Sequence, residues 1–170
     1  MKLKQPVWPR LFPSKAVVAL ATLGPIGRNL PAPGTWGSVA GVSYFAVFFQ
    51  RLNFAENLVA SAVGTYLAVA FCGEAEVRLG KKDPGAVILD EFMAVPLCFL
   101  GWGSLTRSLP EWGVLLAGFL LFRFFDIVKP LGIRRLQTSP GGWGVAIDDT
   151  AAALAACATL HAGVWLWGFL

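Results

Sequence analysis

The chain has 170 residues, with 14 Lys and Arg against ten Asp and Glu, and 56% of its residues are hydrophobic. This length suits one domain, but the low charge and the mean hydropathy of +0.63 exclude an ordinary soluble domain and favour a membrane protein. The basic residues are spread through short hydrophilic gaps without accompanying aromatic residues, so we expect anionic lipid headgroups as partners, and no nucleic acid.

The chain begins with a basic arm, residues 1–15, whose basic side chains are Lys2, Lys4, Arg10 and Lys15. After a short apolar run, residues 24–38 are rich in Gly and Pro, which interrupt regular helices. We therefore expect a loop or a re-entrant segment there.

Five apolar stretches follow, at residues 36–50, 58–73, 92–105, 112–128 and 150–170. The last is long enough to span a bilayer, whereas most of the others are shorter than the ~20 residues of a typical spanning helix. These shorter stretches must borrow flanking residues or lie partly in the interface. The sequence predicts an all-α fold: a small polytopic helical membrane protein, 1–170 as a single domain, with about four to five membrane-embedded helices.

Lys and Arg alternate between rich and poor gaps along the chain. The arm has four, residues 78–82 have three and residues 129–135 have three, whereas the intervening gaps contribute only Arg51 and Arg107. The positive-inside rule then assigns the rich gaps to the cytoplasm. This topology brings five acidic residues near the cytoplasmic face: Asp90, Glu91, Asp126, Asp148 and Asp149.

These five acids lie in or beside apolar segments, where one unpaired carboxylate costs roughly 2.5 to 3.5 kcal/mol on insertion scales. We expect them to line one polar site or hold a cation. Adjacent acids point about 100° apart on a helix, so one member of each pair together with Asp126 would suffice. Oxygen ligands favour a hard divalent cation, and Mg²⁺ fits best because it is held by a few carboxylates, waters and substrate phosphate.

Basic residues lie close to these acids in the sequence. Arg123, Asp126 and Lys129 follow one another at intervals of three, so Asp126 can pair with either cation along a helix. Cations beside a carboxylate-bound metal suit a phosphoryl group. The Gly/Pro segment can add backbone N–H donors and the Thr35 hydroxyl to the same phosphate.

Four ordered motifs point to a known family: LPAPGTWGS at 30–38, DEF at 90–92, FRFFDIVKP at 122–130 and GGWGVAIDD at 141–149. Together they resemble phosphatidylglycerophosphatase A. The resemblance covers about residues 24–152. It implies a magnesium-dependent hydrolase of a phosphoric monoester, a lipid phosphatase of phospholipid biosynthesis that converts phosphatidylglycerol phosphate to phosphatidylglycerol and inorganic phosphate. It also implies a multi-pass protein of the bacterial inner membrane, whose active site faces the cytoplasm.

The resemblance carries roles onto residues of this chain. The expected metal ligands are Asp90, Glu91, Asp126, Asp148 and Asp149, with Asp83 as a further candidate. The same five acids, with Lys129, are the expected catalytic residues. The expected substrate-binding residues are Gly34, Thr35, Ser38, Arg123 and Lys129. Neither the nucleophile nor the oligomeric state follows from the sequence.

Two other functions compete with the phosphatase. One is a small cation- or proton-coupled transporter, in which acids within the membrane form the ion path. A carrier of that kind should distribute acids across the membrane depth, whereas these cluster at one face. The other is a non-catalytic membrane subunit whose acids only bind a cation.

Overall fold

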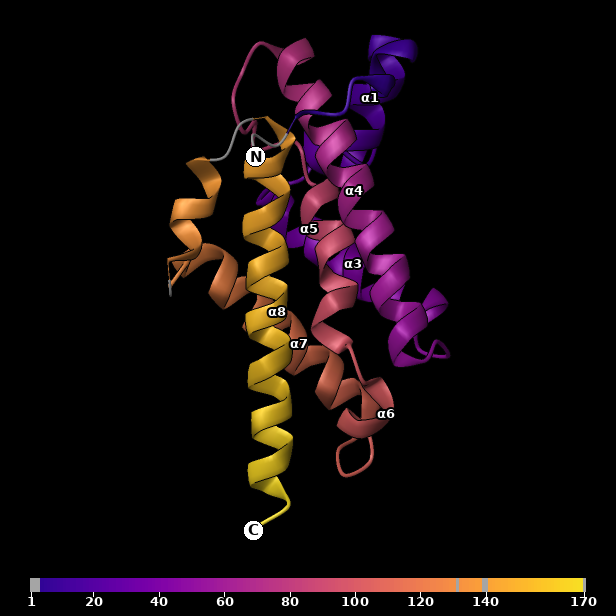
Figure 1. The fold of residues 1–170 in the computed structure, drawn as a ribbon, viewed down its shortest axis with the longest axis vertical. Helices are drawn as coiled ribbons and strands as arrows, with labels where there is room; N and C mark the ends of the chain where they lie inside the picture. Colours follow the sequence, from indigo (N-terminus) through magenta and orange to yellow (C-terminus); the bar gives the residue numbers. More distant parts are fainter. Residues whose placement is uncertain (1–3, 131, 139–140, 170) are drawn as a thin grey trace.

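The computed structural model describes residues 4–130, 132–138 and 141–169, and all the regular elements within them are helices. The all-α prediction is therefore confirmed. Figure 1 shows α4 (Phe54–Leu79) and α8 (Gly142–Trp167) running along the long axis of the molecule, with α7 (Glu111–Val128) crossing obliquely. α8 packs against both α4 and α7.

Local sequence explains the length of α4. Asn53 caps its N-terminus in a capping box with Glu56, and Gly80 ends it in a left-handed conformation with φ of 62°. Of the helices in the described residues, α4 and α8 are the two that are long and apolar enough to cross a membrane. The predicted number of four to five embedded helices stays a prediction.

The N-terminal part contains η1 (Trp8–Leu11), α1 (Ser14–Ala21), α2 (Pro25–Asn29) and α3 (Pro33–Phe48). The prediction of a loop over 24–38 was therefore wrong for most of its length, whereas the alternative of a re-entrant segment stays a prediction. Both α2 and α3 begin with proline, and a first-turn proline is tolerated because its missing N–H has no helical partner. The prolines here start helices rather than prevent them.

The apolar stretch 92–105 was predicted as one element, and this was wrong. It is divided among α5 (Leu89–Ala94), η2 (Val95–Phe99) and α6 (Trp102–Leu105). Pro96 has no backbone N–H to donate, and Gly101 adopts a left-handed conformation with φ of 74°. As a result α5 is short and ends inside the molecule.

The other apolar stretches correspond to single helices. Residues 36–50 lie mainly in α3, 58–73 in α4 and 112–128 in α7, while the stretch 150–170 is the later part of α8. A further short element, η3 (Ile133–Thr138), connects α7 to α8. The arm residue Lys2 and the terminal Leu170 fall outside the described residues.

The buried apolar side chains form two clusters, and the acidic residues lie where these meet. One cluster contains Leu89 and Ala146, and the other contains Ala94 and Ala152. α5 and α8 each contribute to both clusters. Asp90 and Glu91 of α5, and Asp148 and Asp149 of α8, lie between the residues that these helices contribute to the two clusters.

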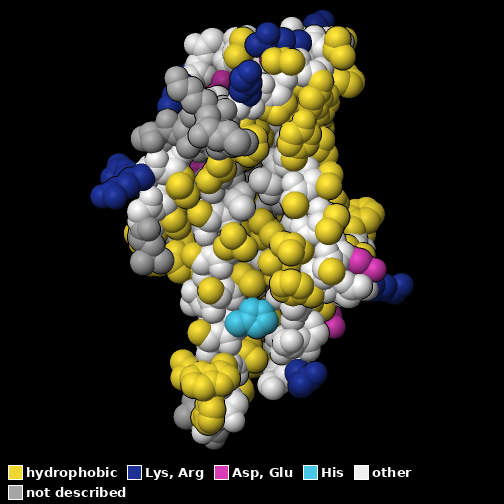
Figure 2. Space-filling view, in the orientation of Figure 1, with side chains coloured by type: hydrophobic (Ala, Val, Ile, Leu, Met, Phe, Trp, Pro, Cys, Tyr) yellow, Lys and Arg dark blue, Asp and Glu magenta, His cyan; other side chains and the backbone are white. Residues whose placement is uncertain are grey.

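The outer surface is largely apolar. Figure 2 shows hydrophobic side chains over much of the visible face, with Lys and Arg gathered mainly at the end where α1 lies. Exposed large side chains occur on several helices, including Val47, Val59, Trp112, Ile127 and Trp165. Such a surface is suited to lipid rather than water.

Candidate active site

Three helices bring the five predicted acids to one cavity. Asp90 and Glu91 lie in the first turn of α5, Asp126 in the last turn of α7, and Asp148 and Asp149 in the second turn of α8. The cavity has a volume of about 130 Å³. It is lined by Asp83, Gly85, Val87, Asp90, Glu91, Asp126, Lys129, Val145, Asp148 and Asp149.

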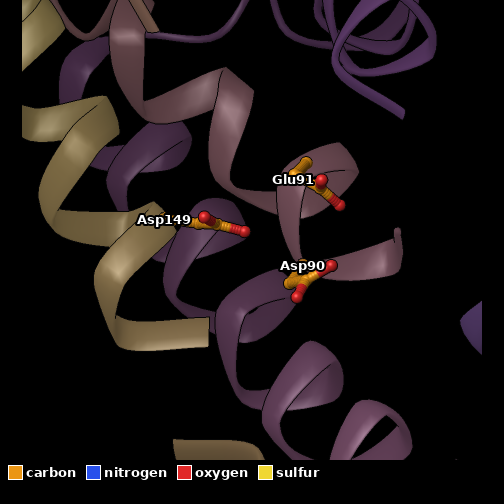
Figure 3. Close-up of side chains that lie close together, drawn as sticks. All are labelled: Asp90, Glu91 and Asp149. Atoms are coloured by element: carbon orange, nitrogen blue, oxygen red, sulfur yellow. The ribbon is translucent and has the colours of Figure 1, made fainter. Parts of the chain in front are cut away.

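Three of these carboxylates form a group that can hold a metal ion. One oxygen from each of Asp90, Glu91 and Asp149 lies within 4.8 Å of the others. Figure 3 shows Asp149 reaching from α8 towards the two acids of α5. The group therefore includes both members of the α5 pair, whereas we had expected one member of each pair with Asp126. The first turn of α5 gives both side chains access to the same space.

Buried oxygens without partners support a cation at this place. Asp90 and Asp149 are only 5% and 4% exposed. Asp90 Oδ1, Glu91 Oε2 and Asp148 Oδ1 are buried and accept no hydrogen bond from the described residues. Leaving a buried carboxylate oxygen unpaired is costly, and a hard cation ligated by oxygens removes that cost. The donor set thus fits Mg²⁺.

The environment of the cavity raises the pKa values of Asp90 and Glu91, the two acids of α5, which lie outside both candidate spanning helices. Burial, followed by the charge of Glu91, raises the pKa of Asp90 well above its usual range. Burial also raises the pKa of Glu91 to about 7, and the charge of Asp126 contributes to the rise. Both shifts come first from burial and then from neighbouring negative charge, and a bound cation would offset both.

Two cations extend the site beyond the acids. Arg123 Nη1 lies 2.6 Å from Asp126 Oδ2 and also donates to Ser38 Oγ at 3.3 Å. Lys129 Nζ lies 3.9 Å from Asp126 Oδ1 and 2.5 Å from Asp148 Oδ2. Burial opposes the charged form of Lys129, but the hydrogen bond to Asp148 and nearby acids raise its pKa overall. Lys129 is therefore a protonated, oriented donor.

The sequence favours this position of Lys129. It ends α7 with φ of 48°, a left-handed conformation that stops the helix at the edge of the cavity. Its side chain bridges α7 to α8 through Asp148, while Arg123 connects α7 to α3 through Ser38. Each basic residue thus joins two helices of the site.

Small residues let α3 approach α5 closely. A Cβ at Gly37 would lie 3.0 Å from Ile88 Cβ, and one at Gly41 would lie 2.8 Å from Val95 Cβ. At Gly34 a Cβ would overlap the Glu91 carboxylate. The absence of a side chain at Gly34 therefore allows the Glu91 carboxylate to lie against the backbone of α3.

Two predicted site residues are less closely engaged. Within the described residues the Thr35 hydroxyl makes no hydrogen bond, and Thr35 does not line the cavity. Asp83 lies at the rim, is exposed, and donates its backbone N–H to Glu76 Oε1 at 2.6 Å. Ser38 is fully buried and donates to Gly34 O at 2.8 Å.

One supporting residue was missed by sequence reasoning. Gln5 donates to Val69 O at 2.9 Å and accepts from Gly142 N at 2.8 Å, so it joins α4 to the start of α8. Trp143 Nε1 donates to Lys4 O nearby. Gln5 is an uncharged residue within a basic arm, and no motif in the sequence distinguishes it.

The chain resembles characterised proteins over most of its length. The family model described as Phosphatidylglycerophosphatase A matches residues 19–164. A Haemophilus influenzae protein named Phosphatidylglycerophosphatase A is 36% identical over 78% of this chain and 78% of its own. An Escherichia coli protein of the same name is 31% identical over 79% and 76%.

A Bacteroides thetaiotaomicron protein named "Putative phosphatidylinositol-3-phosphatase" is 33% identical over 92% of this chain and 98% of its own length. No solved structure matches the chain. The relatives are thus bacterial, and each is named for the removal of a phosphate from a phospholipid headgroup.

Proposed function

Because the chain belongs to the phosphatidylglycerophosphatase A family, we propose that it hydrolyses phosphatidylglycerol phosphate to phosphatidylglycerol and inorganic phosphate. The names of the H. influenzae and E. coli relatives support this substrate. The observation that carries the proposal is the cavity in which five carboxylates meet Lys129, with Arg123 held by Asp126.

We assign Mg²⁺ to Asp90, Glu91 and Asp149, whose oxygens lie close enough together to share one ion. When bound, the ion supplies positive charge that stabilises the phosphoryl oxygens during hydrolysis. Asp126 and Asp148 are engaged differently, because each already pairs with a cationic side chain. Their role in this proposal is to orient Arg123 and Lys129.

Arg123 and Lys129 then bind the phosphomonoester. Both side chains are mostly buried and already fixed by carboxylates, so little ordering is needed when a phosphate arrives. Gly34 lets the Glu91 carboxylate lie close to Arg123 against the backbone of α3, and Ser38 Oγ accepts a hydrogen bond from the Arg123 guanidinium. Hydrolysis breaks the bond between phosphorus and the glycerol oxygen; water supplies hydroxide to phosphorus and a proton to the departing oxygen.

We further propose that the protein is a multi-pass protein of the bacterial inner membrane, with its active site facing the cytoplasm. Support comes from the two long apolar helices and from the basic gaps, which fall on the same side as the acids. The acids also gather in one cavity rather than along the membrane depth, which favours an enzyme over an ion path.

The test is phosphate release from phosphatidylglycerol phosphate in detergent by the purified chain, with Mg²⁺ and with EDTA. We expect release with Mg²⁺ only. Asp149→Asn should lower the rate about 10²-fold or more, because it removes one charge from the three-carboxylate group. A melting curve for each variant checks that the fold survives.

The matched control is Glu111→Gln, an exposed acid at the other end of α7 that does not line the cavity. It should retain wild-type activity. If the folded wild-type chain releases no phosphate from this lipid or from other lipid phosphates, the phosphatase assignment is wrong. A transporter or a non-catalytic subunit would then be the better account.

A further inference from the structure

A second, larger cleft adjoins the active-site cavity. It is lined by Lys82, Asp83, Gly144 and Val145 and has a volume of about 250 Å³. Asp83 and Val145 also line the active-site cavity, so the two spaces are neighbours that share these residues. We call this space the outer cleft. It lies between the α4–α5 connection and the first turn of α8.

The outer cleft has one cationic side chain in its lining. Lys82 is exposed, and within the described residues its side chain forms no ion pair or hydrogen bond. By contrast, Arg123 and Lys129 are already paired with acids in the inner cavity. Asp83 also lines the outer cleft, so an anion entering here would meet the Lys82 ammonium group beside one carboxylate.

The proposed substrate supplies such an anion. Phosphatidylglycerol phosphate carries two phosphates: a terminal monoester, which is hydrolysed, and a phosphodiester that joins the glycerol headgroup to the lipid. If the monoester occupies the inner cavity, the phosphodiester must lie a short glycerol unit away. The outer cleft is the adjoining space that offers a cation for it. A phosphatidylinositol monophosphate, the lipid class named for one relative, has the same pairing of monoester and phosphodiester.

We propose that Lys82 binds the phosphodiester of the substrate in the outer cleft and so selects phosphomonoesters carried on a phospholipid headgroup. Phosphatidic acid has its monoester directly on diacylglycerol and lacks the phosphodiester, so it gains nothing from Lys82. This inference rests on the proposed phosphatase function. It adds a residue that determines substrate class to the residues that surround the monoester.

The test compares kcat/KM for phosphatidylglycerol phosphate and phosphatidic acid of the same acyl chains, in mixed micelles with Mg²⁺. We expect Lys82→Ala to lower kcat/KM for phosphatidylglycerol phosphate about fivefold to tenfold, mainly through KM, since an exposed ion pair contributes modestly. The value for phosphatidic acid should stay unchanged. Lys82→Arg, which keeps the charge, should retain the preference for phosphatidylglycerol phosphate.

Lys81→Ala is the matched control, because Lys81 is an equally exposed neighbour that does not line the outer cleft. It should alter neither substrate. Equal losses on both lipids in Lys82→Ala would show a general attraction of anions and overturn the inference. An unchanged preference, or a wild-type chain with no preference, would also overturn it. A wild-type chain inactive on both lipids would instead overturn the proposed function.

Discussion

Gly34 shows how one missing side chain shapes the site. It lies in the first turn of α3, where a Cβ would overlap the Glu91 carboxylate and lie 3.4 Å from Arg123 Nη1. Two functional groups from α5 and α7 thus converge on the backbone of a third helix. The glycine is required here for close approach.

We expect Gly34→Ala to lower kcat/KM for phosphatidylglycerol phosphate by about tenfold or more, because the methyl group displaces Glu91 or Arg123 and small misplacements are costly to catalysis. Steady-state phosphate release checks this. The control is Gly163→Ala in α8, where a Cβ meets no atom within 4 Å. That variant should keep its activity and gain about 0.5–1 kcal/mol in free energy of unfolding. Wild-type activity in Gly34→Ala would contradict the requirement for this close approach.

At the residue scale, the sequence predicts charged groups better than neutral ones. Asp90, Asp126 and Asp149 were proposed as site residues because a carboxylate in an apolar segment is costly, and the structure places them at one cavity. The expected hydrogen-bonding role of Thr35 was a weaker inference, and its hydroxyl remains without a partner in the described residues. The supporting role of Gln5 could not be predicted from the sequence, because its hydrogen-bond partners are backbone atoms far along the chain.

At the scale of elements, the start of α8 depends on the N-terminal arm. Gln5 bonds Val69 O of α4 and Gly142 N of α8, and Gly142 itself packs against α4 too closely for any Cβ. The same helix carries Asp148 and Asp149 one turn later. The arm therefore supports the position of the site although it lies outside it.

We expect Gln5→Ala to lower the free energy of unfolding by about 1–3 kcal/mol, because it leaves a backbone N–H and a carbonyl without their partner. Unfolding of the detergent-solubilised protein, followed by helical circular dichroism, measures it. Lys4→Ala is the control, since only the backbone carbonyl of Lys4 is engaged. If both variants unfold together with the wild type, the arm contributes nothing to this junction.

Apolar patterning located the long helices but not the short ones. Continuous apolar runs predicted the four helices α3, α4, α7 and α8. The run 92–105 is equally continuous in hydropathy, but the structure divides it among α5, η2 and α6. Pro96 and Gly101 were visible in the sequence, but neither excludes a kinked continuous helix. The packing of α3 against Ile88 and Val95 favours the observed path, and such packing cannot be inferred from a single segment.

At the scale of the whole molecule, a cation in the three-carboxylate group would join α5 to α8. A ligand that binds only the folded state stabilises it by mass action, by about 2.7 kcal/mol at a concentration of one hundred times Kd. We therefore expect Mg²⁺ to raise the melting temperature relative to EDTA.

Asp149→Asn should reduce or abolish this rise, and Glu111→Gln should retain it. Of these two residues, Asp149 belongs to the three-carboxylate group and Glu111 does not. Differential scanning fluorimetry in detergent provides the measurement. An equal rise in both variants would mean that Mg²⁺ acts elsewhere on the protein. This readout does not depend on turnover, so it tests the metal site separately from the proposed substrate.

The contact between Gln5 and Gly142 also has a consequence for biosynthesis. The ribosome makes the arm before one of its two bridging partners, which lies 137 residues further along the chain. During synthesis Gln5 therefore lacks its hydrogen-bond partner on α8 while the earlier helices enter the bilayer. A chain released before α8 would lack both this contact and two of the five carboxylates, Asp148 and Asp149, so we expect an incomplete product to be inactive.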